Sequence, residues 1–301
     1  MRQRREWFDL HDDTLAEPDV AVVGMPFDAS ASRQVGASQA PARLRELSRT
    51  SDPITRRGQP VEGLTLRDFG DLNTPAANNG SQPDYLAQAQ TRLYNLPKSS
   101  FLLLIGGDNS ISIAGIGAFM KRNGPDAGVI WFDAHPDLFE QYDGNPDSHA
   151  CALRRAMTLS GLTAANAVML GTRSFSREES RFIAESGIEM VSAADWLSSS
   201  TDAVFGRILR RLGDRSAIYL AVDIDGLDAS CAPGTGYPMP GGVGSAAFFD
   251  LLDLLVERLP IKAMDPTEIS PPLDTNDVTG FLGVQVILET LGGLSRSRLP
   301  A

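Results

Sequence analysis

The chain has 301 residues, and 27 Lys and Arg against 38 Asp and Glu give it a formal charge of −11 at pH 7. Hydrophobic residues make up 42% of the chain and charged residues 22%, which is typical of a globular protein with a large core. The acidic balance argues against nucleic acid as a partner, because phosphate binding needs clustered Lys and Arg. The longest apolar runs, such as Phe101–Ile105, are far shorter than the roughly 20 residues of a membrane-spanning helix, so we expect no membrane partner.

The start of the chain and its cysteines indicate a cytoplasmic protein. Basic residues in the first five positions are not followed by the apolar segment that a secretory signal requires. Cys151 and Cys231 form neither a CxxC pair nor a disulfide framework. No repeat, low-complexity tract or long linker divides the sequence, so we expect residues 1–301 to form a single catalytic domain.

Short apolar runs alternate along the chain with segments of helical spacing. We predict strands at Val20–Met25, Phe101–Ile105, Val129–Phe132, Ala167–Leu170, Glu189–Val191, Ile218–Val222 and Ile261–Met264. The spacing predicts helices that include Ala40–Leu47, Asp202–Leu212 and Ala246–Leu259. Near-continuous apolar strands that alternate with helices predict an α/β fold with a parallel sheet covered on both faces.

Polar residues follow four of these runs at the point where each strand should end. The segments are 106–110 (GGDNS), 133–137 (DAHPD), 223–228 (DIDGLD) and 265–268 (DPTE). Ligands of open parallel sheets bind beyond the carboxyl ends of the strands. We therefore expect these four segments to deliver carboxylates, a histidine and an amide to one crevice.

Two aspartate clusters have the spacing of metal ligands. Asp133, His135 and Asp137 alternate along a segment that, if extended, points all three side chains the same way, and Asp223 and Asp225 repeat the pattern. Carboxylates gathered so closely repel one another unless cations neutralise them, and a pair of divalent metals about 3.5–4 Å apart is the simplest solution. The oxygen-rich set with one imidazole and no thiolate favours Mn²⁺, or another hard to borderline ion, over structural Zn²⁺. Either pair taken alone is equally typical of a helix cap or an ion pair.

Five blocks of sequence, taken together, resemble the ureohydrolase superfamily, which contains arginase, agmatinase and formimidoylglutamase. They are GGDNS at 106–110, FDAHPDL at 132–138, SHACALRRA at 148–156, VDIDGLDASCAPGTGYPMPGG at 222–242 and DPTEISPPLD at 265–274. The blocks occur in the family's order over about residues 20 to 290. The stretch 135–151 is most similar to agmatinase-like members.

The resemblance implies a three-layer αβα domain with a central parallel sheet and a binuclear Mn²⁺ centre. By position, the implied metal ligands are residues 109, 133, 135, 137, 223 and 225, with Asp133 and Asp223 as bridges. His149 matches the proton-transfer histidine, and Glu268 matches the acid that binds the guanidinium of the substrate. Without the resemblance, His149 is more typical of a surface loop, and Glu268 is more typical of an acid in a helix or turn after Pro266. Family members form trimers or hexamers, so a homo-oligomer is expected.

One implied ligand departs from the family pattern, because position 109 is Asn where the family has His. An amide oxygen is a weaker donor than imidazole for most first-row metals, so we expect one of the two ions to be held weakly. The resemblance implies hydrolysis of a small guanidino compound, agmatine-like or arginine-derived, to urea and an amine. A formimidoylglutamase-type C–N hydrolase and a non-catalytic paralogue stay open. The acidic loop Leu138–Ser148 mildly favours a substrate with an amine tail.

Overall fold

All eight strands of the structure lie in one sheet, and every pair of neighbouring strands is parallel. The computed structural model describes residues 5–74 and 80–298. The strands are β1 Val20–Met25, β2 Leu66–Asp71, β3 Phe101–Gly106, β4 Gly128–Phe132, β5 Ala167–Leu170, β6 Glu189–Val191, β7 Ile218–Asp223 and β8 Ile261–Thr267. Their order across the sheet is β2-β1-β3-β8-β7-β4-β5-β6.

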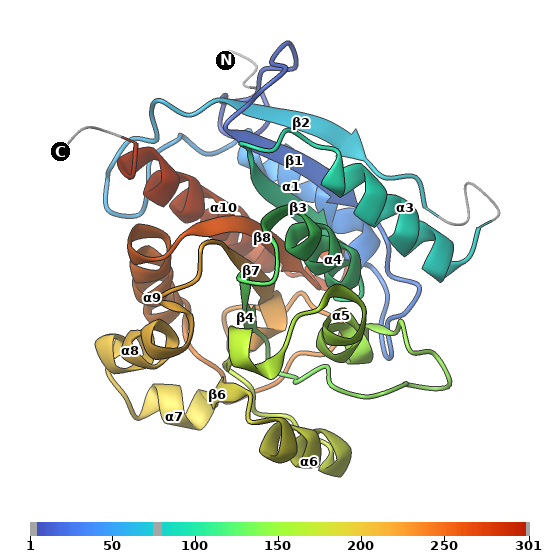
Figure 1. Cartoon of the computed structure of the whole chain (residues 1–301). Helices are drawn as coiled ribbons and strands as arrows, with labels where there is room; N and C mark the ends of the chain where they lie inside the picture. Colours follow the sequence, from blue (N-terminus) through green and yellow to red (C-terminus); the bar gives the residue numbers. More distant parts are fainter. Residues whose placement is uncertain (1–4, 75–79, 299–301) are drawn as a thin grey trace.

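Helices cover both faces of the sheet, so that the protein has three layers (Figure 1). The helices are α1 Ala40–Ser48, α3 Gln82–Tyr94, α4 Ile111–Asn123, α5 Ala152–Ser160, α6 Arg177–Ser186, α7 Ala193–Leu197, α8 Thr201–Leu212, α9 Ser245–Arg258 and α10 Val278–Arg296. Side chains from α1, α7, α8, α9 and α10 form one apolar core, and those from α3, α4 and α5 form the other. The predicted α/β fold, a three-layer αβα arrangement around a parallel sheet, is confirmed.

The central strands read as continuous apolar runs because each contributes alternate side chains to the two cores. In β7, Ile218, Leu220 and Val222 pack into the core with α8 and α9, whereas Tyr219 and Ala221 pack into the core with α3 and α4. The seven predicted strands are all present, with ends that differ by at most three residues. The strand β2 was not predicted, because it lies at the edge of the sheet and its sequence LRDFGD has only Leu66 buried.

The helix α10 is the one described helix that is long and apolar enough to cross a membrane, a feature that the short apolar runs of the sequence did not indicate. Within the structure, 72% of its most apolar window is buried. It packs against α9 and α1 as a core helix (Figure 1).

Candidate metal centre

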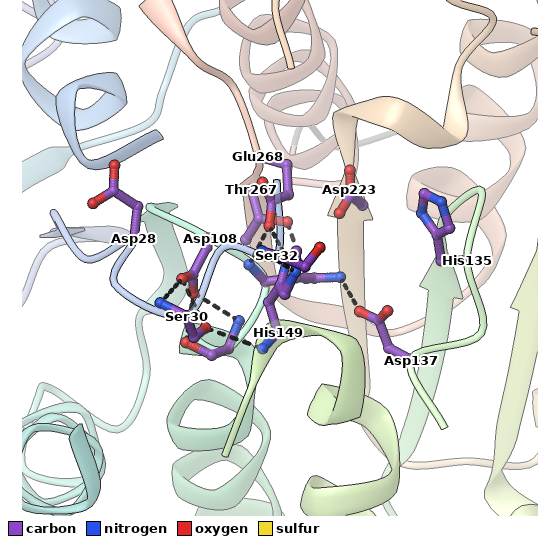
Figure 2. A network of polar contacts seen from close by, with 12 residues as sticks. Asp28, Ser30, Ser32, Asp108, His135, Asp137, His149, Asp223, Thr267 and Glu268 are labelled. Atoms are coloured by element: carbon purple, nitrogen blue, oxygen red, sulfur yellow. Dashed lines mark hydrogen bonds and ion pairs between the residues drawn. The ribbon is translucent and has the colours of Figure 1, made fainter. Parts of the chain in front are cut away.

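Four strands that are adjacent in the sheet carry the predicted site residues at their carboxyl ends. In the order β3-β8-β7-β4, these ends lead to Asn109, Glu268, Asp223 and Asp133. Figure 2 shows the side chains of Asp137, Asp223, His149 and Glu268 gathered beyond these ends. The sheet order therefore brings together residues that are up to 159 positions apart in the sequence, such as Asn109 and Glu268.

Asp133, His135 and Asp225 form the tightest group of possible metal ligands in the described part of the chain. One ligand atom from each lies within 4.8 Å of the others. The Nδ1 atom of His135 is 3.2 Å from Oδ2 of Asp225 and 3.5 Å from Oδ1 of Asp133. Asp223 lies beside this group, since its Oδ1 accepts the backbone N–H of Asp225 at 2.8 Å. Three carboxylates and one imidazole nitrogen are a donor set that fits a divalent ion such as Mn²⁺.

Asp137 reaches the cluster by a different route from the one predicted. Residues 133–137 are not a strand, and Asp137 has a φ of 51°, in the left-handed region that non-glycine residues rarely adopt. Its Oδ2 accepts a hydrogen bond from Nδ2 of Asn109 at 2.8 Å, and Oδ2 of Asp133 accepts from the same nitrogen at 2.9 Å. The expectation of an extended segment is thus wrong, although Asp133 and Asp137 do converge.

Burial and crowding make the carboxylate cluster electrostatically unfavourable without a cation. Burial, and then repulsion from Asp225, raises the pKa of Asp133 to about 7. The pKa of Asp137 and that of Asp223 are raised well above the usual range by burial and by neighbouring carboxylates. Burial is the largest influence on Asp225 and would raise the pKa of this carboxyl, but the charge of His135 and several hydrogen bonds together outweigh burial and lower the pKa. A divalent cation would relieve this repulsion.

His149 and Glu268 form a hydrogen-bonded pair beside the cluster. The Nδ1 atom of His149 is 2.9 Å from Oε1 of Glu268, and the backbone N–H of Ser32 donates to Nε2 of His149 at 2.9 Å. Because Nε2 accepts, the neutral ring carries its proton on Nδ1, which then donates to Glu268. Burial lowers the pKa of His149, but the hydrogen bond to Glu268 and nearby carboxylates outweigh burial and raise it to about 9.

The backbone of Glu268 has a left-handed conformation that non-glycine residues rarely adopt. Its φ is 59°, and its Oε1 also accepts the backbone N–H of Asn109 at 3.0 Å. Among the described residues, the second oxygen, Oε2, has no hydrogen-bond partner. Left-handed backbone at a non-glycine residue persists only where the surrounding structure stabilises it, and such residues cluster at functional sites.

Comparison with known proteins identifies the family to which this fold and site belong. The sequence model of the arginase family matches residues 18–292. The chain belongs to the arginase family. The agmatinase of Bacillus subtilis is 31% identical over 92% of this chain and 92% of its own length. The guanidinobutyrase of Pseudomonas aeruginosa is 28% identical over 91% of this chain and 85% of its own length. The structure of proclavaminate amidino hydrolase from Streptomyces clavuligerus has a TM-score of 0.87 and 29% identity, and the match covers 98% of each chain.

The predicted ureohydrolase membership and arginase-like fold are confirmed by these matches, and the chain is an arginase-family hydrolase. The cavity of this arginase-family chain joins the aspartate cluster to the His149–Glu268 pair. It has a volume of about 250 Å³, and the residues that line it include His135, Asp223, Asp225, His149 and Glu268. Metal identity and the individual roles of these residues stay predictions.

Loops contribute cavity residues that the sequence analysis missed. Arg33 and Ser32 come from the loop after β1, and Tyr237 comes from the loop after β7. The guanidinium of Arg33 lies 5.3 Å above the centre of the Tyr237 ring. Arg33 and Ser32 lie in none of the five sequence blocks. Tyr237 lies within the block at 222–242, which marked its loop but not its place in the cavity wall.

Proposed function

We propose that this chain hydrolyses a C–N bond of a small guanidino compound, with water as the second substrate and urea and a protonated amine as products. The observation that supports the proposal is one cavity that holds both a divalent-metal ligand set and a carboxylate with a free oxygen. The bound metal would supply an activated water near neutral pH, which a resonance-stabilised guanidinium requires. Asp133, His135, Asp223 and Asp225 would hold that metal.

Glu268 binds and orients the guanidinium in this proposal. Its Oε1 is committed to His149 and to the N–H of Asn109, so its Oε2 is the atom that accepts hydrogen bonds from the substrate. A carboxylate that accepts from a guanidinium forms charge-assisted hydrogen bonds, which are among the strongest in proteins. Its burial, with 5% of the residue exposed, strengthens this attraction further.

His149 supplies the proton that the departing amine needs. The proton on Nδ1, shared with Oε1 of Glu268, lies next to the carboxylate that binds the guanidinium. Because the pKa of His149 is raised to about 9, its ring is protonated at neutral pH and can act as a general acid.

The residues that line the cavity determine which type of substrate tail it favours. Glu140, Asp143 and Asp147 are not among its lining residues, and Asp147 pairs with Arg155 at 2.7 Å, so the acidic loop gives no reason to favour an amine tail. Glu179 does line the cavity, but its two oxygens accept the N–H groups of Leu138 and Ser176. Arg33 has no ion-pair partner within the described residues, and its cation favours a carboxylate tail. We therefore propose a guanidino acid over agmatine.

A screen for urea release with Mn²⁺-loaded protein tests the proposal. We expect turnover of guanidino compounds, and a fall of about 10²–10⁴-fold in kcat for His149→Ala with unchanged metal content. His11 lies outside the cavity and accepts the backbone N–H of Asp68, so His11→Ala is the matched control and should keep its turnover. No urea from any guanidino compound, with the fold and metal intact, would refute the proposed reaction. Loss of metal in His149→Ala would show that His149 is a ligand.

A further inference from the structure

Asn109 directs hydrogen-bond donors, not a metal ligand, at the aspartate cluster. Its side chain is 1% exposed and follows β3. The two hydrogens of its Nδ2 are both used, one by Oδ2 of Asp133 at 2.9 Å and one by Oδ2 of Asp137 at 2.8 Å. The sequence predicted a weak oxygen ligand at this position, but the structure has the amide nitrogen there.

One hydroxyl group on the far side of the amide, that of Thr267, holds it in this orientation. Thr267 Oγ1 donates to Oδ1 of Asn109 at 3.1 Å, and Ser112 Oγ lies 3.3 Å from the same oxygen. Ser112 is itself closest to Oδ2 of the buried Asp265, at 2.6 Å. In the reversed orientation, Oδ1 would lie within 3 Å of two carboxylate oxygens, which repels unless a cation intervenes.

An ion between Asp133 and Asp137 would compete with the NH₂ group of Asn109 for the space between their Oδ2 atoms. Metal–carboxylate bonds are about 2.0–2.2 Å long, so an ion that joined these two Oδ2 atoms would need the space of the Asn109 NH₂ group, whose nitrogen lies 2.9 and 2.8 Å from them. The N–H groups carry partial positive charge and therefore reduce part of the repulsion between Asp133 and Asp137 that a cation would otherwise neutralise. This half of the cluster does not fit a second metal in the observed arrangement.

The other half of the cluster is free of Asn109. Oδ1 of Asp133 and Oδ2 of Asp225 face Nδ1 of His135, and Nε2 of His135 is buried with no hydrogen-bond partner in the described residues. The ligand atoms needed for one ion are thus already gathered. We propose that the amide of Asn109 replaces the first metal ion, and that this chain binds one divalent ion, through Asp133, His135, Asp223 and Asp225. This inference rests on the proposed metal-dependent function and specifies its metal content.

Metal counting on protein stripped with chelator and reloaded with Mn²⁺ tests the inference. We expect one tightly bound Mn²⁺ per chain by elemental analysis and calorimetry, with the electron paramagnetic resonance spectrum of an isolated ion. Asn109→His should bind a second ion and show a spin-coupled pair, because imidazole replaces the N–H donors with a nitrogen ligand. If the larger histidine ring disturbs folding, the nearly isosteric variant Asn109→Asp replaces it, and it should also bind a second ion because a carboxylate oxygen takes the place of the N–H donors. The control Asn123→His, at the end of α4 with its amide on the carbonyl of Phe119, should still bind one ion.

The outcomes separate this inference from the proposed reaction. Two tight, coupled ions in the unmodified protein would overturn the inference and leave the hydrolysis proposal standing. One ion in the unmodified protein and two in Asn109→His or Asn109→Asp would support it, even if no guanidino compound were hydrolysed. One ion in all variants would overturn it, because Asn109 would then not decide the count.

Discussion

Replacement of Gly107 by Ala tests how closely the loop after β1 is fixed against the site. A Cβ at this position would lie 1.9 Å from the carbonyl oxygen of Phe27 and 2.8 Å from that of Met25. Real Cβ contacts essentially never fall below 3.0 Å, so the loop must move by at least about 1 Å. The carbonyls cannot simply turn away, because Phe27 O accepts the N–H of Asp108 at 2.7 Å and Met25 O accepts that of Gly107 at 3.1 Å.

The displaced loop carries Ser32, whose N–H orients His149. Overpacking of this kind typically destabilises by about 1–3 kcal/mol, which lowers the Tm of a chain this long by roughly 2–10 °C. A shift of about 1 Å in a positioning group reduces turnover roughly 100-fold. We therefore expect Gly107→Ala to lower both quantities, measured by thermal unfolding and by urea release.

The matched control for this substitution is Gly206→Ala in the middle of α8. There a Cβ would meet only the guanidinium end of Arg210, at 3.7 Å, so the gain in helix propensity should stabilise the protein by about 0.5–1 kcal/mol without changing turnover. Gly107→Ala with unaltered Tm and unaltered turnover would refute the reasoning, because it would show that the loop yields without affecting His149.

Two further substitutions test the buried ion pair and the substrate tail. Burial would raise the pKa of Asp68, but the hydrogen bonds and charge of Arg45, 2.6 Å away, lower it. The pair therefore stabilises the fold at pH values above the ordinary aspartate pKa. This stabilisation is lost as the pH falls through the lowered pKa that Asp68 has in the folded protein. Asp68→Asn should therefore cost about 3–5 kcal/mol in denaturant unfolding at pH 7 and less in acid; equal loss at pH 7 and in acid would contradict this. Arg33→Glu should reduce kcat/KM for 4-guanidinobutanoate about tenfold and raise kcat/KM for agmatine. The control Arg210→Glu makes the same charge change outside the cavity and should alter neither value. If the ratio of the two kcat/KM values does not change in Arg33→Glu, Arg33 does not recognise the substrate tail.

The sheet could be predicted from the sequence wherever a strand is buried on both faces. Such strands need apolar side chains at every position, which makes runs such as Phe101–Ile105 conspicuous. Among the described strands, the edge strand β2 pairs with β1 alone, and its Asp68 pairs with Arg45 instead of packing into a core. A strand of this kind has no apolar run to reveal it.

The site residues that could be predicted from the sequence are those that lie at or directly after strand ends. The placement of Asp133, Asp223 and Glu268 follows from the parallel sheet, because these residues end three neighbouring strands. The cavity wall does not follow, since Arg33 and Tyr237 lie on irregular loops that meet only in three dimensions. Likewise, nothing in the sequence indicates that the N–H of Ser32 meets His149, 117 positions away. Cytoplasmic location, a homo-oligomer and a single domain over residues 1–301 stay predictions.

The role of Asn109 shows why a ligand motif alone does not define a metal centre. The sequence shows that position 109 carries an amide, and an amide offers either an oxygen that can bind a metal or an NH₂ group that competes with one. In the proposed arrangement, Thr267 of β8 makes this choice, because its hydroxyl donates to the oxygen end of the amide, whereas the hydroxyl of Ser112 from α4 lies beside that oxygen but is directed at Asp265. Ser112 is held in turn by Asp265, whose Oδ2 also accepts the hydroxyl of Tyr219 at 2.6 Å. The same Asn with apolar neighbours would be free to turn its oxygen toward a cation, so under the one-ion proposal the metal content depends on the hydroxyl of Thr267 as well as on residue 109 itself.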